Sequence, residues 1–384
     1  MTTPQSITDL RHLHLVLLFT EGVSLATWER GGLFDREVAL YRSLRPHLGR
    51  VTFVTYGDRH DLNLAHRIEG IGIVCNRWRL AKKWYLRTLP LALRSCRRGP
   101  TIFKTNQIRG GEVALKLARR MGQPCIVRCG YLLSDHLKWR EGPDAEATQK
   151  ATALERTLFS QADHGIVSAG FMKRMVVTDH AIDPGRISVM HNYVDTRLFF
   201  PNPACTPHPR RIIFIGRLER VKNTLALIEA LEGLDLELWI VGDGTERKTL
   251  ENASQTRKVA TRFFGIRPHH ELPELLNSAT AFILPSFWEG HPKTLLEALS
   301  CGLPCIGSDI PSIADVITHG ENGLLCGLAP PSIRQAVTTL LEDPEMRTRL
   351  GENARAYALQ HLSLESIVAR ELDLYRTLLS RPSR

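Results

Sequence analysis

The stretch AFILPSFWEGHPKTLLEALSCG, residues 281–302, decides the fold. Its first six residues, AFILPS, are almost entirely apolar, and a loop with glycine and proline, FWEGHP, follows them. KTLLEALSC then has the apolar spacing of a helix, and Gly302 is of the residue type that commonly ends one. A strand, a short loop and a helix in this order predict one unit of a parallel sheet that is covered by helices.

The same alternation of apolar runs and helical patterns extends along the whole chain. The runs are LHLVLLF, VTFVTY, TIFKT, CIVRC and HGIVS in the first half, and RIIFIG, LELWIVG, TRFFG, AFILPS and PCIGS in the second. PNPACTPHPR, residues 201–210, contains four prolines and separates the two series. We therefore expect an α/β protein of two doubly wound, Rossmann-like domains, 1–200 and 211–362, with a linker at 201–210. A further helix is expected at 363–384, packing back toward the N-terminal domain.

Composition and charge restrict the class of protein. Hydrophobic residues make up 43% and charged residues 23% of the 384 positions, and no apolar run is long enough to span a bilayer. The polar N-terminus predicts a leader into the first strand rather than a signal peptide. The eight cysteines include no CxxC pair, so we interpret them as reduced, buried thiols of a cytoplasmic protein.

The net charge of +10 is unevenly distributed. Residues 1–200 carry 30 Lys or Arg and 18 Asp or Glu, whereas residues 201–384 carry 20 and 22. This asymmetry favours a charged partner surface on the N-terminal half.

The loops after the C-terminal strands are the candidate site, because ligands bind outside the carboxyl ends of strands in open parallel sheets. Gly216 ends one apolar run, and Arg217 and Lys222 follow around the start of a helix. Two cations near a helix N-terminus suit a diphosphate, although a solvated basic turn is the alternative. Gly242 and Gly244 lie at and just after the end of the next apolar run, LELWIVG. They could let the backbone approach a ligand closely, or they could simply form a turn.

The opening stretch contains two glutamates, eight positions apart. Glu289 lies on the loop, and the backbone N–H groups at the start of the following helix, including those of Thr294 and Leu295, are predicted to be uncapped donors for phosphate or sugar oxygens. Glu297 lies about one turn into the helix, where it could accept hydrogen bonds from both hydroxyls of a ribose. Taken alone, Glu297 would be interpreted as a surface helix residue.

Several motifs together resemble the C-terminal half of the retaining GT-B glycosyltransferases of family GT4. They are GRLERVKN, VGDG, FFG, the opening stretch with its E-x7-E spacing, and HGENGLL. ADHGIVSAGF and HNYVDTRLFFP resemble the end of the family's first domain. The resemblance is detailed over residues 160–345 and general over 1–160. It implies the GT-B fold, with the active site in the cleft between two Rossmann-like domains.

The resemblance implies a role for each candidate residue. Arg217 and Lys222 would neutralise the diphosphate of a nucleotide-sugar donor, so no metal and no cofactor is expected. Glu289 would bind donor-sugar hydroxyls and stabilise the reacting centre, and Glu297 would bind the ribose. The implied donor site further contains Gly216, Gly242, Gly244, Gly265, Ile266, Gly290, His291, Thr294 and Leu295, with Gly265 and Ile266 at the base.

The acceptor is expected on the N-terminal domain. Gly31 and Gly32, in WERGGLFDRE, match the glycine-rich loop after the family's first strand. In VRCGY, Cys129 stands where the family often has a histidine near the donor sugar, which is a departure from the pattern. The backbone of Arg128 and Cys129 is nevertheless expected to line the cleft.

A basic aromatic stretch covers residues 76–98, NRWRLAKKWYLRTLPLALRSCRR. It contains eight Lys or Arg, no acidic residue, two tryptophans and a tyrosine. This pattern favours an element that lies on an anionic membrane surface. The alternative is a helix pair whose arginine stems cover the core.

The expected function is a retaining, metal-independent transfer of sugar from a nucleotide diphosphate donor to a glycan or lipid-linked acceptor, in cell-surface polysaccharide or glycolipid synthesis. The protein would be cytoplasmic or peripheral on the inner face of the cytoplasmic membrane. One alternative is a GT-B enzyme of other chemistry, such as an epimerase or a phosphorylase. Another is a basic nucleic-acid-binding protein, but the chain has no recognition motif for it and we expect no nucleic acid.

Overall fold

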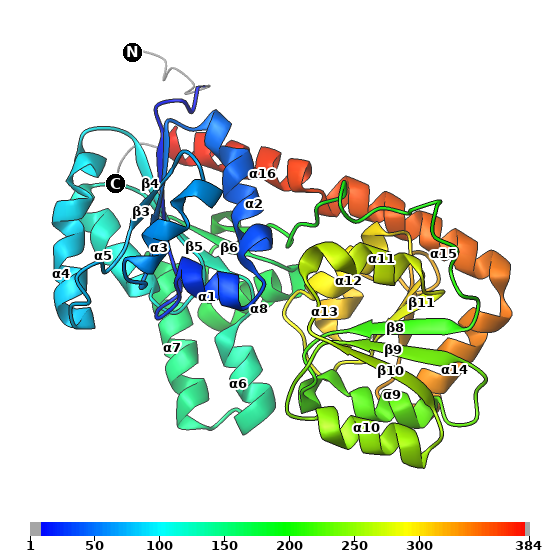
Figure 1. Cartoon of the computed structure of the whole chain (residues 1–384). Coiled ribbons are helices and arrows are strands. Elements are labelled where there is room, and N and C mark those ends of the chain that lie inside the picture. The colour runs from blue at the N-terminus through cyan, green and yellow to red at the C-terminus, as the bar shows by residue number, and fades with distance from the viewer. Residues whose placement is uncertain (1–8, 381–384) are drawn as a thin grey trace. The chain divides into compact units, whose positions relative to one another are not determined.

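The computed structural model describes residues 9–380, which form two compact units (Figure 1). The first unit contains the described residues up to Met190 together with those from Ile367 onward, and the second contains His191–Ser366. The predicted polar leader falls largely on residues 1–8, and the end of the predicted C-terminal helix falls on 381–384, which lie outside the described residues. Between residues 9 and 380, no helix combines the length and hydropathy that a membrane span requires.

The first unit is built around a seven-stranded parallel sheet with the strand order β3-β2-β1-β4-β5-β6-β7. Its strands are β1 (His14–Leu18), β2 (Arg50–Val54), β3 (Ile71–Val74), β4 (Thr101–Thr105), β5 (Cys125–Cys129), β6 (His164–Val167) and β7 (Ile187–Val189). Its helices are α1 (Leu25–Arg30), α2 (Phe34–Leu44), α3 (His60–Asn63), α4 (Lys82–Ala92), α5 (Gly111–Met121), α6 (Leu133–Glu141), α7 (Glu146–Gln161), α8 (Gly170–His180) and most of α16 (Leu364–Leu379).

The second unit is built around a six-stranded parallel sheet with the order β10-β9-β8-β11-β12-β13. Its strands are β8 (Arg211–Ile215), β9 (Glu237–Val241), β10 (Ala260–Gly265), β11 (Ala281–Leu284), β12 (Cys305–Ser308) and β13 (Leu324–Cys326). Its helices are α9 (Thr224–Ala230), α10 (Arg247–Thr256), α11 (Leu272–Asn277), α12 (Lys293–Ser300), α13 (Pro311–Ala314), α14 (Pro330–Glu342) and α15 (Pro344–Tyr357). The prediction of two doubly wound α/β units is confirmed.

Apolar runs form these strands because helices cover both faces of a parallel sheet. Leu15, Val16 and Leu17 of β1 are fully buried, as are all four residues of β11. In each sheet, later strands add on both sides of the first one, so the direction of addition changes between β1 and β4 and between β8 and β11. Such switch points are where open α/β sheets bind ligands.

The proline-rich segment 201–210 belongs to the second unit, contrary to its predicted role as a linker. The backbone N–H of Asn202 donates to the side chain of Asn277 (2.8 Å), and that of His208 donates to the carbonyl of Ser278 (3.0 Å). The hydroxyl of Thr280 donates to the carbonyl of His208 (2.7 Å). These bonds attach the segment to the end of α11 and the start of β11. The chain passes between units at Met190 and His191, before the predicted boundary at residue 200.

Helix α16 contributes to the core of the first unit from Ile367 onward. Its Glu371 forms an ion pair with Lys104 of β4, and both side chains are at most 2% exposed. Tyr375, one turn further along, is fully buried. Burial lowers the pKa of Lys104, while the charge of Glu371 opposes this shift.

Candidate active site

The switch point of the second sheet brings together the two residues that the sequence made the centre of the site. Lys222 follows β8 and Glu289 follows β11, and Lys222 Nζ lies 2.5 Å from Glu289 Oε1. The two side chains are only 14% and 9% exposed. The backbone N–H of Phe287 donates to the carbonyl of Val221 (2.8 Å), which joins the two loops directly. The loops therefore hold a cation and a carboxylate in contact, largely screened from water.

Two serines that the sequence analysis missed support Glu289. The hydroxyl of Ser286 donates to Glu289 Oε1 (2.7 Å), and the hydroxyl of Ser308 donates to the carbonyl of Ser286 (2.6 Å). Ser286 and Ser308 are fully buried. Each lies at the carboxyl end of an apolar run, and this position was the available signal for them in the sequence. Together they fix the carboxylate that faces Lys222.

The first cation on the β8 loop, Arg217, has a different environment from Lys222. Its side chain is exposed, and Nη1 lies 2.9 Å from Glu219 Oε1, two residues along the same loop. The two predicted phosphate-binding cations therefore differ in burial and in their carboxylate partner. A flexible, exposed guanidinium can reorient toward an anion at low cost, whereas Lys222 is already held in place.

The glycines after β8 and β9 serve the packing of one loop against another. A Cβ atom on Gly242, whose φ is +132°, would lie 1.9 Å from the carbonyl oxygen of Gly216. A Cβ on Gly244 would lie 2.4 Å from the carbonyl oxygen of Leu218. The backbone N–H of Leu218 donates to the carbonyl of Asp243 (2.9 Å). Close contact with neighbouring protein backbone thus explains why glycine is needed at positions 242 and 244. A close approach of the backbone to a ligand was one of the two predicted reasons for these glycines.

The loop after β10 is tied to the same edge of the sheet. The backbone N–H of Gly242 donates to the carbonyl of Gly265 (2.8 Å), and Gly265 has a φ of +69°. Ile266, predicted with Gly265 at the nucleotide base, is a strongly exposed apolar residue. An exposed isoleucine beside a fixed backbone turn provides an apolar surface on which a planar base can lie.

Helix α12 begins at Lys293, directly after the Glu289 loop, and Pro292 at its N-cap makes no side-chain cap. Thr294 lies in this first turn. The backbone N–H of Leu295 donates to the carbonyl of Pro292 (3.1 Å), so the prediction that this group is an uncapped donor is wrong. The proline carbonyl closes the first turn, which places the N–H of Leu295 inside the helix.

His291 and Gly290 are buried on this loop, and the HNYVD segment packs against it. The rings of His191 and His291 stack with centroids 5.1 Å apart and planes at 18°. The side-chain amide of Asn192 donates to the carbonyl of His291 (2.9 Å). His191 and Asn192 were missed as individual residues, although their motif was part of the resemblance.

Glu297 is 3% exposed, unlike a surface helix residue. Its Oε1 lies 2.9 Å from Nε2 of His269, which follows β10. The ring of His269 in turn lies 5.0 Å from that of the buried Phe199. His269 had no signal in the sequence, because PHHELP has the composition of an exposed turn.

The predicted acceptor residues lie in the first unit, and the glycine pair is not where it was expected. Gly31 ends α1 and Gly32 has a φ of +65°, so the pair connects α1 with α2. The loop that directly follows β1 contains Glu21 and Gly22 instead, and its Glu21 N–H donates to the carbonyl of Arg109 (3.1 Å) beyond β4. The two glycines therefore belong to the connection between α1 and α2, because the short helix α1 lies between β1 and this glycine pair.

Arg128 and Cys129 end β5, beside β4 of the first switch point. Arg128 Nη1 donates to the carbonyl of Asn106 (3.3 Å). The Cys129 thiol is fully buried and donates to the carbonyl of Tyr131 (2.8 Å). Burial raises the pKa of Cys129 well above its usual range, so the side chain is a neutral thiol at physiological pH.

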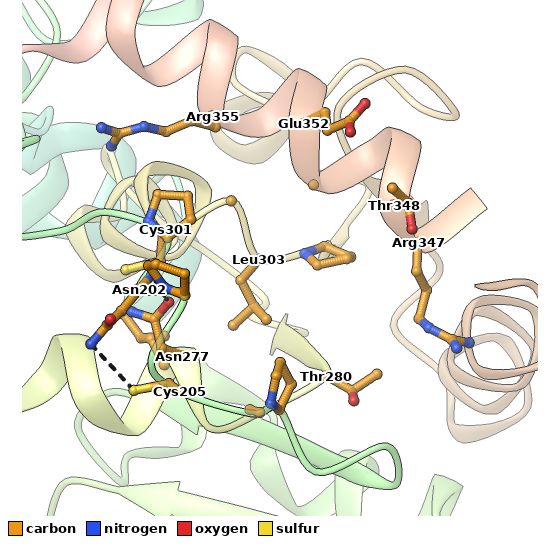
Figure 2. Close-up of a pocket in the computed structure, with 18 of the residues that line it drawn as sticks. Asn202, Cys205, Asn277, Thr280, Cys301, Leu303, Arg347, Thr348, Glu352 and Arg355 are labelled. Carbon is orange, nitrogen blue, oxygen red and sulfur yellow. Dashed lines mark hydrogen bonds between the residues drawn. The ribbon is translucent and has the colours of Figure 1, made fainter. Parts of the chain in front are cut away.

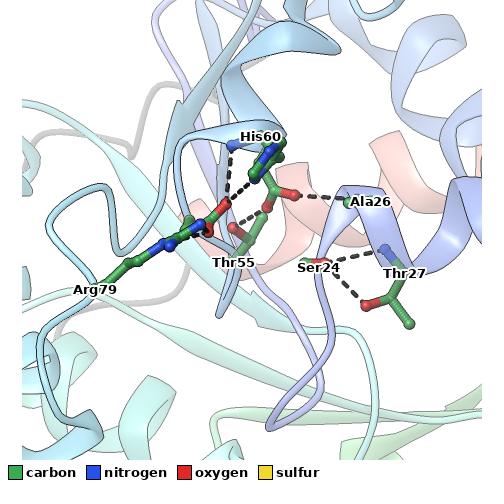
Figure 3. Close-up of polar contacts among 8 residues, drawn as sticks. Ser24, Ala26, Thr27, Thr55, His60 and Arg79 are labelled. Carbon is green, nitrogen blue, oxygen red and sulfur yellow. Dashed lines mark hydrogen bonds and ion pairs between the residues drawn. The ribbon is translucent and has the colours of Figure 1, made fainter.

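A network of polar residues ties the loops after β1 and β2 together (Figure 3). The hydroxyl of Ser24 accepts from the backbone N–H of Thr27 and caps α1. The buried carboxylate of Asp61 accepts from the backbone N–H of Ala26 (3.1 Å) and from the hydroxyl of Thr55 (2.5 Å). The start of α1 is therefore held at the carboxyl edge of the first sheet.

A pocket of about 710 Å³ lies in the second unit (Figure 2). Its lining includes Thr280 and Pro304, which precede β11 and β12, so it lies at the opposite edge of the sheet from Lys222 and Glu289. It is formed by the end of α11 and the α11–β11 connection, the α12–β12 connection, the proline-rich segment and α15, and its lining also includes Leu303 and Arg355. None of the predicted site residues lines it. The pocket therefore belongs to a different part of the unit from the candidate site.

Two family models match adjoining parts of the chain. The model described as "Glycosyl transferases group 1" matches residues 198–357, which include Lys222, Glu289 and Glu297. The model described as "Glycosyltransferase Family 4" matches residues 31–198. The first match covers most of the second unit, and the second covers most of the first.

Curated relatives match more than half of the chain at low identity. The alpha-maltose-1-phosphate synthase of Mycolicibacterium smegmatis is 27% identical over 270 residues, which are 62% of this chain and 69% of that protein. The UDP-Gal:alpha-D-GlcNAc-diphosphoundecaprenol alpha-1,3-galactosyltransferase of Escherichia coli is 26% identical over 303 residues, 71% and 74% of the two chains. The match to the N-acetyl-alpha-D-glucosaminyl L-malate synthase of Bacillus anthracis, at 27% identity, covers 52% of this chain and only 56% of that protein.

The fold is shared with a solved structure over nearly the whole chain. The structure of Anabaena HepE in complex with UDP matches with a TM-score of 0.78 at 16% identity, covering 95% of this chain and all of that one. The two family models together span residues 31–357, and the matched residues include Lys222 and Glu289, which meet at the second switch point. The chain belongs to the group 1 glycosyltransferases of family 4.

Proposed function

We propose that this glycosyltransferase moves a sugar from a nucleotide diphosphate donor onto a glycan or lipid-linked acceptor, with retention of the anomeric configuration. The contact between Lys222 and Glu289 at a switch point carries the proposal. In the free protein each neutralises the other, and a donor would give both new partners: phosphate oxygens for the ammonium and sugar hydroxyls for the carboxylate. The E. coli relative, a galactosyltransferase whose name includes UDP-Gal, supports a sugar nucleotide as donor.

The leaving diphosphate would be stabilised by protein cations without a metal ion. Lys222 is fixed by Glu289, and the exposed Arg217 would turn from Glu219 onto the diphosphate. Two positive charges at this position replace the charge that a divalent ion supplies in other transferases. Glu297 would bind the ribose, and Ile266 would lie against the base. Transfer is therefore expected to continue in EDTA.

The test is a panel of UDP-, GDP- and ADP-sugars, followed by NMR of the product to assign the anomeric configuration. Lys222→Ala and Glu289→Gln should each lower kcat/KM by about 100-fold or more, because each removes an interaction with charge that develops in the transition state. Arg220→Ala is the matched control, since Arg220 is an exposed cation in the same turn, and it should stay within about twofold of wild type. Wild-type rates in both variants, or an inverted product, would contradict the proposal.

The acceptor or its carrier would lie at a membrane surface reached through residues 76–98. Helix α4 buries Tyr85 and Leu89, while Trp78, Trp84 and Leu91 are 61%, 57% and 69% exposed. The guanidinium of Arg77 lies 4.0 Å from the ring centroid of Trp78, and that of Arg87 lies 4.6 Å from that of Trp84. Exposed tryptophans combined with cations match the interface of an anionic bilayer on the inner face of the cytoplasmic membrane. The E. coli relative, whose name includes a diphosphoundecaprenol, supports a lipid-linked acceptor.

Vesicle flotation tests this surface. The wild-type protein should float with phosphatidylglycerol vesicles and much less with phosphatidylcholine, and binding should fall at high salt. The double variant Trp78→Ala/Trp84→Ala should lose most of the binding. Trp139→Ala is the control because Trp139 is also exposed but lies on α6, outside residues 76–98. Equal flotation of the double variant and wild type would exclude this surface as the contact.

A further inference from the structure

The carboxylate of Glu297 is held from a second element, and the partner is a histidine. Glu297 projects from α12, which follows β11, whereas His269 belongs to the short 3-10 helix His269–Glu271 after β10. Their 2.9 Å contact spans the sheet edge between strands that are not neighbours. Glu297 is almost fully buried, whereas the His269 side chain keeps 19% exposure. The imidazole is therefore the more accessible member of the pair.

The ring of His269 is itself fixed by packing. Phe199 is fully buried and its ring lies 5.0 Å from the imidazole, with planes at 53°. The carbonyl of Phe199 accepts from Arg355 Nη1 (2.8 Å) and from the hydroxyl of Ser300 (2.7 Å), so the phenylalanine backbone is anchored to α15 and to the end of α12. The end of α12 thus fixes Phe199, and Phe199 supports the histidine that holds Glu297.

A carboxylate on a helix has freedom about three side-chain torsions, and recognition of a pair of ribose hydroxyls requires one orientation. A histidine N–H to Glu297 Oε1 removes that freedom before the nucleotide arrives. The pairing also offsets the cost of burying a carboxylate. Leucine at position 269 would remove both effects, whereas glutamine can place its amide N–H near the position of the histidine Nε2.

We propose that His269 is a positioning residue for Glu297 and thereby sets the preference of the donor site for a ribonucleotide over a 2′-deoxyribonucleotide. The inference rests on the proposed function, in which Glu297 binds the ribose. His269 contacts the carboxylate and contributes to nucleotide binding through it. Its loss should therefore weaken the ribonucleotide selectively and leave the 2′-deoxy analogue nearly unchanged.

The experiment uses titration calorimetry on the full chain. UDP, GDP and ADP are first titrated into the wild-type protein, and the tightest ligand is then compared with its own 2′-deoxy analogue. The wild type should bind the ribonucleotide about tenfold or more tightly than the analogue, because a hydrogen bond to a charged group is lost. His269→Leu should reduce this ratio to about two or less, whereas His269→Gln should restore most of it.

His270→Leu is the matched control, because His270 is the exposed neighbour in the same turn and should leave the ratio unchanged. Thermal melts establish that each variant is folded, and a merely structural role for His269 would weaken both nucleotides equally. A wild-type ratio retained in folded His269→Leu would overturn this inference alone. No binding, or no discrimination by the wild type, would overturn it together with the proposed role of Glu297.

Discussion

Lys222 and Glu289 illustrate what a single residue position can and cannot predict. The spacing of GRLERVKN and E-x7-E marked both residues, and the sheet order explains why they meet: β8 and β11 are neighbours at the switch point. The sequence assigned the two residues separate ligands, a diphosphate and a sugar. It did not predict that they would neutralise each other in the free protein, because that contact depends on the pairing of strands more than 60 residues apart.

Partners from distant segments were beyond the sequence for the same reason. His269 contacts Glu297 from 28 positions away and had no signal in the sequence. Ser308 supports Ser286 from 22 positions away, and its only signal was its place at the end of an apolar run. Motif reasoning finds residues that chemistry requires in a fixed spacing. It does not find the residues that hold them, since those are selected by the geometry of the folded loops.

His14, at the start of β1, gives a residue-scale prediction for pH. Its Nε2 lies 2.8 Å from the hydroxyl of Thr52, and its Nδ1 lies 3.6 Å from the thiol of Cys96. Burial, with a smaller contribution from the charge of Arg50, lowers the pKa of His14 from 6.5 to about 4. Between pH 6.5 and about 4, His14 therefore takes up a proton more readily in the unfolded chain than in the folded one. The stability that comes from burying neutral His14 is fully present above pH 6.5 and is lost as pH falls toward 4.

Urea unfolding between pH 7 and 4 measures the effect. The free energy of unfolding of the wild type should fall across this range, and His14→Gln should fall less steeply because glutamine does not titrate. His12→Gln is the control, since His12 is exposed two residues earlier, and it should follow the wild type. Identical slopes for wild type and His14→Gln would contradict the assignment to His14.

At the scale of elements, the strands were predictable and several connections were not. Apolar runs bounded by glycine and proline marked the strands, because both faces of each sheet are buried. The Gly31–Gly32 pair was misplaced because the short helix α1 was not anticipated after β1. Proline ordinarily breaks a helix, yet α4 runs from Lys82 to Ala92 and contains Pro90. Pro90 lies in the last turn, where the helix is about to end.

The loop after β9 carries the element-scale prediction. Gly242→Ala should destabilise the protein by roughly 2–4 kcal/mol, because the new Cβ would meet the carbonyl oxygen of Gly216 and the residue has a positive φ. Gly99→Ala is the control, since a Cβ there meets nothing within 4 Å and its φ is not positive. Urea unfolding measures both variants. A cost for Gly242→Ala below about 0.5 kcal/mol would show that the two loops can separate without penalty.

At the scale of the whole molecule, the first unit is assembled from both ends of the chain. Lys104 and Glu371 are 267 positions apart and form a buried pair between β4 and α16. A C-terminal helix was expected from its apolar spacing, but nothing in the sequence marked Lys104 as buried, because lysine in a strand is ordinarily interpreted as exposed. In a buried pair of this kind each charge offsets the burial cost of the other, so neither charge is tolerated alone.

The pair predicts a non-additive pattern of stability. Lys104→Met and Glu371→Leu should each lower the free energy of unfolding by about 3–5 kcal/mol, because each leaves one buried charge uncompensated, and the double variant should recover most of that loss. Lys150 and Glu146 on α7 form an exposed pair, so Lys150→Met should cost less than about 1 kcal/mol and serves as the control. Hydrogen exchange of β4 amides, measured beside urea unfolding, would locate the loss in the first unit. Single variants as stable as wild type would mean that water or a neighbouring group compensates the remaining charge, and α16 would then be held by its apolar face alone.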